Sequence, residues 1–278
     1  MADYIINWNA DPVLFWVTEN FPFKYYGMLF ALGLILGYNI VKQIYKKEQV
    51  PVADLDKLLG YIIVGTVLGA RLGHCLFYDF DYFWHHPLEI LIPIQKIGGS
   101  YQFVGFRGLA SHGGAIGVLI AITVYCRKYK LHLFWVLDRV AIAVPVAGAF
   151  IRFGNFMNSE IYGKPTNGKW GVVFMQDDSL PRHPTQLYEA FSYLLITIIL
   201  LYLYKTKITE RSNGILFGVF LILLFSARFI IEFFKENQEA FENGMIINMG
   251  QILSIPFILL GVALVIFRRQ KSAAYSIK

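Results

Sequence analysis

The residue types best suited to bind a charged ligand gather in one short segment, residues 152–163, which reads R-F-G-N-F-M-N-S-E-I-Y-G. It places Arg152, Asn155 and Glu160 directly after an apolar run that looks long enough to span a membrane. Polar groups are costly beside lipid, and those kept there usually bind something. Because arginine presents a planar fork of N–H donors that matches a phosphate group, we expect Arg152 to hold an anion.

A second charged pair lies inside another apolar run. Arg228 and Glu232 are four residues apart, so both side chains can share one helix face. Either they form an internal salt bridge that satisfies both charges, or Glu232 orients Arg228 toward a ligand phosphate. Two arginines at one depth, Arg152 and Arg228, would repel each other unless an anion or an acid lies between them. Acids are few here, so the pattern favours a bound phosphate.

One histidine stands out by its neighbours. His112 lies in L-A-S-H-G-G, where two glycines follow it at once. A lone histidine in a helix is more often a hydrogen-bonded core residue. The glycines favour the other interpretation, because they remove side chains beside the imidazole and let a ligand or a backbone come close. In that case His112 could take a proton from a thiol or hydroxyl nucleophile.

The composition indicates what must position these residues. The chain has 278 residues, of which 56% are hydrophobic and 16% are charged, and its mean hydropathy is +0.50. A soluble domain of this size carries far more charge, so the surplus apolar residues are expected to face lipid. Seven apolar runs each approach the about 20 residues that a hydrocarbon core of about 30 Å demands. They are Tyr25–Val41, Leu58–Phe80, Leu109–Cys126, Leu133–Ile151, Leu187–Tyr204, Ile215–Phe234 and Ile252–Phe267.

The expected fold is therefore an all-α integral membrane protein with seven transmembrane helices. We expect one polytopic domain over residues 1–278, with long outer loops at 81–108 and 155–185. A short strand could form at residues 169–174 within the second loop. Glycines at four-residue spacing, as in Gly65, Gly69 and Gly73, predict close helix packing. Asp138 and Arg139, near one end of the fourth run, are interpreted as a snorkelling or paired boundary feature.

Charge placement predicts the topology. Most of the 25 Lys and Arg residues lie in the loops after the first, third and fifth spans and in the C-terminal tail. The positive-inside rule then puts the N-terminus outside and the C-terminus in the cytoplasm, so the basic composition does not indicate nucleic-acid binding. This topology brings the polar residues of several spans into the outer half of the membrane. They are Tyr26, Arg71, His112, Arg152, Asn155, Glu160, Arg228 and Glu232.

These residues carry a resemblance to a known family. Residues 152–163 are similar to the signature of bacterial prolipoprotein diacylglyceryl transferases, G-R-x-G/A-N-F-x-N-x-E-x-x-G, which ends here at Gly163. Further matching motifs follow in the right order along the chain: Y-Y-G, G-A-R-L-G, S-H-G-G-A-I-G, R-H-P-T-Q-L-Y-E, R-F-I-I-E-F-F and G-Q-I-L-S-I-P. Two positions depart from the family pattern, namely Ile151 where glycine is usual and Leu224 where tyrosine is usual.

The resemblance implies a specific reaction. Such enzymes transfer the diacylglyceryl group of phosphatidylglycerol to the lipobox cysteine of a prolipoprotein signal peptide, forming a thioether and releasing glycerol phosphate. It also implies a multi-pass protein of the bacterial cytoplasmic (inner) membrane, with its active site toward the outer leaflet and with no metal or cofactor. The substrates are then phosphatidylglycerol and prolipoprotein signal peptides, within the membrane lipid and without nucleic acid.

The implied roles follow residue by residue. The expected catalytic residues are His112, Arg152 and Arg228. The expected substrate-binding residues, besides Arg152, are Tyr26, Arg71, Asn155, Glu160, Gly163 and Glu232. A membrane lipid transporter or flippase is the alternative, because a polar cluster can also line a substrate path. That alternative predicts broken helices at the membrane midplane and inverted repeats, and the sequence shows neither.

Overall fold

The computed structural model describes residues 4–19, 21–92, 94–97, 100–103, 108, 110–206, 212–236, 242 and 244–268. The chain forms two compact units. The first comprises residues 1–44 and 137–278, and the second comprises residues 45–136. Each unit is described by itself.

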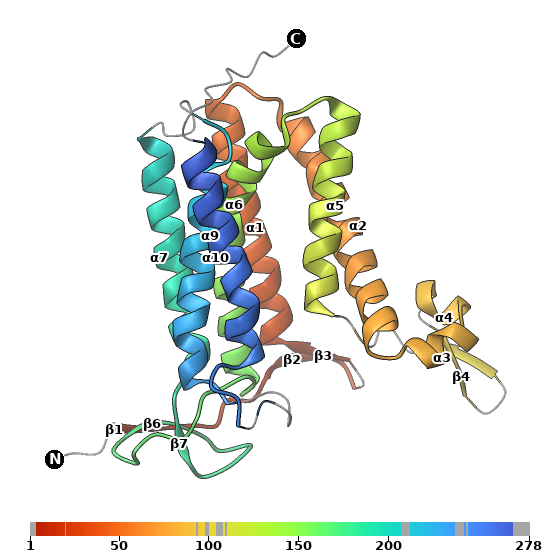
Figure 1. Cartoon of the computed structure of the whole chain (residues 1–278). Helices are drawn as coiled ribbons and strands as arrows, with labels where there is room; N and C mark the ends of the chain where they lie inside the picture. The colour runs from red at the N-terminus through yellow and green to blue at the C-terminus, as the bar shows by residue number, and fades with distance from the viewer. Residues whose placement is uncertain are drawn as a thin grey trace. The chain divides into compact units, whose positions relative to one another are not determined.

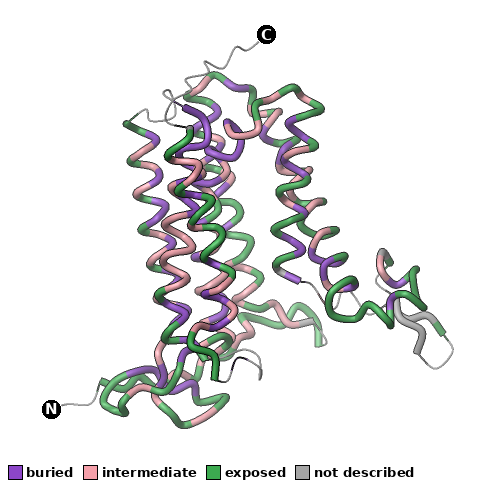
Figure 2. The backbone as a smooth tube through the Cα atoms, viewed as in Figure 1, coloured by how far each residue is buried: buried purple, intermediate pink, exposed green. Residues whose placement is uncertain are grey.

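The first unit is a bundle of long helices that run side by side (Figure 1). The helices are α1 (Tyr25–Lys47), α6 (Leu133–Met157), α7 (Thr185–Lys205), α9 (Ile215–Ile231) and α10 (Met249–Arg268). Fully buried apolar residues such as Ile142, Leu200 and Leu216 form its core. Each helix also has an exposed face (Figure 2), and this face carries large apolar side chains such as Ile35 and Leu259. Such faces suit lipid rather than water.

The helices of the structure match the predicted spans. Among the described residues, six helices are long and apolar enough to cross a membrane, namely α1, α2 (Val52–Phe77), α6, α7, α9 with the short 3₁₀ helix η1 (Glu232–Phe234), and α10. The third predicted span coincides with α5 (Ser111–Tyr129), which is not among those six. The protein is therefore mostly helical with six apolar helices able to span a membrane, and the seventh span stays a prediction.

Small β-structures accompany the bundle of the first unit. Strand β1 (Tyr4–Trp8) pairs in parallel with β6 (Trp170–Phe174), which pairs antiparallel with β7 (Pro181–Arg182). The strand expected at residues 169–174 is thus confirmed, and its partner is the N-terminal segment. A separate hairpin joins β2 (Val13–Thr18) to β3 (Phe21–Lys24). These strands lie at the end of the bundle where α6 ends and α7 begins (Figure 1).

The second unit consists of α2 and α5 with a small subdomain. The subdomain holds α3 (Phe80–His85), α4 (Leu88–Leu91) and the antiparallel strands β4 (Ile94–Ile97) and β5 (Ser100–Phe103). The two long helices touch along their glycines. A Cβ on Gly69 would lie 2.4 Å from the Gly113 carbonyl oxygen, and one on Gly117 would lie 2.0 Å from that of Gly65. The packing role predicted for the spaced glycines is therefore confirmed.

Asp138 caps a helix from across the bundle. Its Oδ2 accepts a hydrogen bond from the Gly214 amide at 2.7 Å, and its Oδ1 accepts one from the Phe217 amide at 2.8 Å. No side chain of α9 itself caps this end, where Gly214 takes a φ of +103°. The Asp138 side chain is fully buried. Of the two expected interpretations, the paired one therefore applies to Asp138, and the snorkelling one does not.

We expect Asp138→Ala to lower the free energy of unfolding by about 2 kcal/mol, because two amides at the start of α9, the buried one of Gly214 and the partly buried one of Phe217, lose their acceptor. Thermal unfolding of the purified protein in detergent measures the change. Asp138→Asn is the matched control, since its amide oxygen can still accept one of the two hydrogen bonds. Equal losses in the two variants would contradict the capping role.

Candidate active site

The end of α6 gathers the polar residues of the segment at 152–163. The helix continues to Met157, so Arg152 and Asn155 lie on its last turns. Beyond it, Ser159 and Ile161 take φ values of +56° and +58°, which turn the chain back on itself. Glu160, between them, returns to the helix end, where its Oε2 accepts a hydrogen bond from Asn155 Nδ2 at 3.2 Å. The turn thus folds the segment into a compact polar group.

Arg152 is held from two sides. Its Nη1 donates to Asn155 Oδ1 at 3.2 Å, and its Nε forms an ion pair with Glu189 Oε2 of α7 at 2.8 Å. The hydroxyl of Tyr193, one turn farther along α7, also interacts with this guanidinium. Glu189 is fully buried, whereas the Arg152 side chain keeps 17% of its surface exposed. The guanidinium is therefore anchored by its neighbours yet still reachable.

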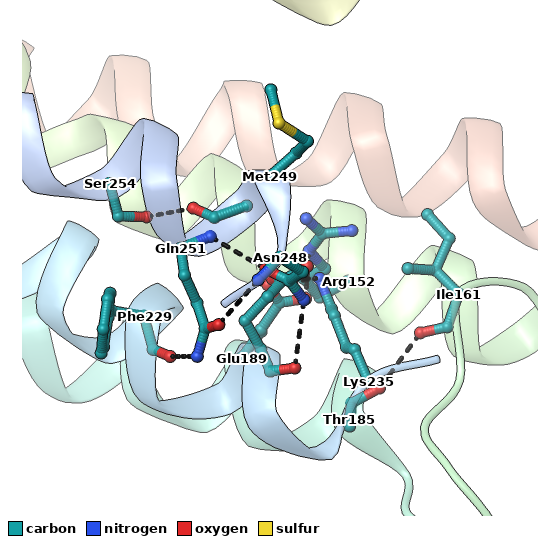
Figure 3. A network of polar contacts seen from close by, with 12 residues as sticks. Arg152, Ile161, Thr185, Glu189, Phe229, Lys235, Asn248, Met249, Gln251 and Ser254 are labelled. Atoms are coloured by element: carbon teal, nitrogen blue, oxygen red, sulfur yellow. Dashed lines mark hydrogen bonds and ion pairs between the residues drawn. The ribbon is translucent and has the colours of Figure 1, made fainter. Parts of the chain in front are cut away.

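Glu189 also binds a second cation. Its Oε1 lies 3.1 Å from Nζ of Lys235, a residue that is itself only 2% exposed. The same Nζ lies 3.6 Å from Glu232 Oε2. Figure 3 shows Arg152 and Lys235 converging on Glu189 from different elements. The site therefore contains a buried chain of alternating charges.

Glu232 and Arg228 do not form the ion pair that their spacing suggested. The Glu232 carboxylate turns to Lys235 and fills the space beside Gly250, where a Cβ would lie 2.5 Å from the carboxyl carbon. Its backbone begins a 3₁₀ turn after α9 ends, so regular i,i+4 geometry no longer applies. Arg228 is half-buried and forms no ion pair or hydrogen bond within the described part of the chain. Its charge is therefore available to a ligand.

The end of α9 is fixed by α10. Gln251 Nε2 donates to the Phe229 carbonyl at 3.3 Å (Figure 3). Asn248 Nδ2 donates to the Glu232 carbonyl at 3.5 Å. Asn248 and Gln251 also exchange hydrogen bonds at the start of α10, each at 3.0 Å. These amides satisfy carbonyls at the helix end and hold the segment that carries Arg228 and Glu232.

Gly163 and Tyr26 belong to the same region of the first unit. The Gly163 amide donates to the His183 carbonyl at 2.8 Å, and a Cβ there would lie 2.5 Å from the Phe234 oxygen. Only glycine fits where these segments of the chain pack against each other. Tyr26, at the start of α1, packs on α6, where a Cβ on Gly154 would lie 2.8 Å from its ring. The structure thus brings Tyr26 and Gly163 to the α6 end with Arg152, Asn155 and Glu160.

Two predicted site residues belong to the second unit. Arg71 is buried, and its Nε and Nη2 donate to the carbonyls of Ile90 and Glu89 at 3.0 and 2.5 Å. Its guanidinium also lies 4.7 Å from the centre of the Phe83 ring. These contacts explain Arg71 as the anchor of α3 and α4, so the expected substrate contact has no support from its geometry.

His112 is exposed at the second position of α5 and has no hydrogen bond within the described residues. It is therefore not the hydrogen-bonded core histidine that is the commoner case. The glycines after it have a different explanation from the one expected. A Cβ on Gly113 would lie 2.3 Å from the Gly69 carbonyl oxygen, so Gly113 serves the packing of α5 on α2.

Comparison with known proteins decides the family. The model of the family described as prolipoprotein diacylglyceryl transferase matches residues 12–267. The chain belongs to this family. The resemblance expected from the motifs is thereby confirmed.

Similar transferases come from several bacteria. A phosphatidylglycerol–prolipoprotein diacylglyceryl transferase of Tolumonas auensis is 49% identical over 267 residues, covering 96% of this chain and 98% of that protein. A protein of the same name from Bacteroides fragilis is 43% identical over 269 residues, covering 96% and 97%. A third, from Porphyromonas gingivalis, is 42% identical over 277 residues and covers 94% of each chain.

The geometry of this diacylglyceryl transferase family member adds two site residues that sequence reasoning missed. Glu189 lies in the motif R-H-P-T-Q-L-Y-E and is a lone carboxylate in the apolar run of α7, which was a usable signal. Lys235 follows η1 and looks like an ordinary loop lysine in the sequence, so no local pattern indicated that it is buried. Of the two departures from the family pattern, Leu224 packs against the bundle core, whereas nothing in the structure explains Ile151.

Proposed function

We propose that this chain transfers the diacylglyceryl group of phosphatidylglycerol to the lipobox cysteine thiol of prolipoproteins. The observation that carries the proposal is the family match over residues 12–267, which includes the ion pair of Arg152 with the buried Glu189 near the end of α6. In the reaction the thiolate sulfur attacks the glyceryl carbon next to the phosphate ester. A C–S bond forms, the C–O bond breaks, and the oxygen leaves with its electron pair as part of glycerol phosphate.

The arginines suit the leaving group. A phosphodiester becomes a phosphate monoester that carries more negative charge, so cations that face it stabilise the transition state. We assign Arg152 to the lipid phosphate, with Asn155 and Glu160 shaping the headgroup site. Arg228 is assigned to the departing phosphate, since its charge has no partner among the described side chains. Glu232 then acts on Arg228 through the local field rather than through an ion pair.

The thiol must lose its proton before it attacks. We propose His112 as the base that takes this proton and Tyr26 as the residue that orients lipid or thiol. The Tyr26 hydroxyl forms no hydrogen bond with the described residues, which suits a group that waits for a ligand. A positive field from the arginines would lower the pKa of the thiol of a bound peptide and assist the same step.

The membrane setting belongs to the same proposal. We propose seven transmembrane helices, with α5 as the third span, the N-terminus outside and the C-terminus in the cytoplasm. The basic loops after the first, third and fifth spans support this orientation. The protein would then lie in the bacterial cytoplasmic (inner) membrane with its site toward the outer leaflet. Phosphatidylglycerol and a signal peptide could both present their reacting atoms at that depth.

The proposal is tested with purified protein, phosphatidylglycerol and a synthetic lipobox peptide. Mass spectrometry should show one diacylglyceryl group added to the peptide cysteine, together with released glycerol phosphate. A peptide with serine in place of that cysteine is the control and should remain unmodified. Lipid that is redistributed between vesicles without any adduct would contradict the proposal and favour a transporter.

We expect His112→Gln to slow transfer about a hundredfold at neutral pH, because the thiol loses its base. The deficit should shrink near pH 9, since a free thiol with a pKa of about 8.5 then ionises unaided. Initial rates of peptide lipidation at several pH values measure both effects. A His112→Gln variant with the normal rate at neutral pH would remove the general-base role and leave thiol activation to the arginine field.

A further inference from the structure

Lys235 is buried between two carboxylates at the heart of the site. It is 2% exposed, and its Nζ lies 3.1 Å from Glu189 Oε1 and 3.6 Å from Glu232 Oε2. Both of these carboxylates are themselves buried. A buried charge is tolerated only when partners compensate it, so the three groups depend on one another.

The backbone of Lys235 is fixed as firmly as its side chain. Gly163 and Lys235 form an antiparallel β-bridge, and the Lys164 amide donates to the Phe234 carbonyl at 2.8 Å. The segment that follows α6 therefore holds the lysine in place from outside the bundle. This arrangement ties the position of Nζ to the segment after α6 that carries Glu160 and Gly163.

Glu189 divides its two oxygens between two cations. Oε2 faces Arg152 Nε at 2.8 Å, whereas Oε1 faces Lys235. If Lys235 were absent, Arg152 would be the cation left among the described residues to neutralise Glu189, and Glu232 would lose its ion pair with Lys235. The attraction would then draw the guanidinium toward α7, where the carboxylates would compensate its positive charge and leave less of it for a ligand.

With Lys235 present, the guanidinium keeps donors for a ligand. Arginine has five N–H donors. Within the described part of the chain, Glu189 engages Nε, Asn155 engages Nη1, and the Tyr193 hydroxyl is the further partner. Donors therefore remain for a phosphate, which arginine can bind through two parallel hydrogen bonds.

We propose that Lys235 is a positioning residue of the anion site: it neutralises Glu189 and Glu232, and so keeps the guanidinium of Arg152 oriented toward the lipid phosphate, with positive charge that the carboxylates do not fully compensate. Lys235 acts through Glu189 and does not itself touch the lipid. The inference rests on the proposed transferase function and deepens it. It predicts a defect in phosphatidylglycerol binding rather than a general loss of active protein.

The test compares steady-state kinetics of four proteins in the lipidation assay. Lys235→Met should raise the KM for phosphatidylglycerol about tenfold, the size expected from weakening one charged hydrogen bond, and leave the KM for the peptide unchanged. Lys235→Arg, which keeps the positive charge, should have a KM for phosphatidylglycerol near that of the wild type. In the double variant Glu189→Gln, Lys235→Met, the amide still accepts from Arg152 without opposing its charge. Its KM for phosphatidylglycerol should therefore fall back to within about threefold of the wild type.

Controls separate this inference from misfolding and from failure of the proposed function. Lys164→Met removes an exposed lysine of the same region, whose Nζ donates to the Phe233 carbonyl at 3.1 Å, and should leave both KM values unchanged. Misfolded Lys235→Met would show a lower kcat with an unchanged KM for phosphatidylglycerol, which overturns the inference. Additive losses in the double variant would also overturn it. A wild-type protein that makes no adduct would instead refute the transferase function itself.

Discussion

Replacing Arg152 by lysine should lower kcat/KM for phosphatidylglycerol about a hundredfold, a loss typical of removing one preorganised donor from a developing anion. Arg152 bridges Glu189 and Asn155 through Nε and Nη1, at 2.8 and 3.2 Å. A lysine ammonium is a single point charge, so it can pair with Glu189 but cannot also present a fork of donors to a phosphate. The lipidation rate of a synthetic peptide, at varied phosphatidylglycerol concentration, measures the effect.

The lysine variant is more informative than an alanine variant. It keeps a cation beside the buried Glu189, so the protein should retain its thermal unfolding temperature to within a few degrees. Arg152→Ala leaves that carboxylate with Lys235 as its only ion-pair partner among the described residues, and should lose both activity and stability. Normal transfer in either variant would refute the assignment of Arg152 to the phosphate.

The second large effect is expected at Gly163. A Cβ there would lie 2.5 Å from the Phe234 oxygen and 2.7 Å from Cβ of His183. Gly163→Ala should therefore push apart the segments around Gly163 and Phe234, and so lower the free energy of unfolding by about 2 kcal/mol. Because Lys235 forms a β-bridge with Gly163, the same shift should disturb Glu189 and slow transfer at least tenfold.

Both losses are measurable on one preparation, by thermal unfolding and by the rate of peptide lipidation. Gly60→Ala is the control, since a Cβ at Gly60 would have no atom within 4 Å and should change neither quantity. A Gly163→Ala protein with normal stability and rate would show that these segments can move apart without affecting the fold or the site, and would contradict the prediction.

The sequence predicted the helices well because each is a long apolar run with its own local signal. Its main errors are span ends placed too early or too late: α1 continues to Lys47 rather than Val41, α2 begins at Val52 rather than Leu58, and α6 continues to Met157 rather than Ile151. At the end of α6 the polar residues suggested a helix end, but Arg152 pairs with the buried Glu189, and Asn155, itself buried, donates a hydrogen bond to Glu160. Once those partners exist, the helix can continue through the polar residues.

Non-local pairings were beyond prediction from spacing. Strand β6 was expected, but its parallel partner β1 lies more than 150 residues away in the sequence, with Tyr4 opposite Trp170. Likewise, the local rule paired Arg228 with Glu232. The carboxylate instead turns to Lys235, which lies in the following segment. Which neighbour a charge selects depends on which elements pack together, and single-sequence patterns do not contain that information.

The residues of the candidate site divide in the same way. Sequence reasoning found Arg152, Asn155 and Glu160, because they crowd into one segment of unusual composition, and the structure joins them by hydrogen bonds. It also selected Arg71, from its depth and its place in the motif G-A-R-L-G, and that side chain binds the backbone of α4. Depth in a membrane limits where a residue can act, but contacts decide what it does.

The central claim is that thiolate attack at carbon transfers a diacylglyceryl group and releases the phosphate. Phosphatidylglycerol labelled with oxygen-18 in the bond between the diacylglyceryl carbon and phosphorus tests it most directly. After reaction with a lipobox peptide, mass spectrometry should find the label in glycerol phosphate and an unlabelled thioether on the cysteine. A cysteine adduct that retains the label, or no adduct at all, would contradict the account.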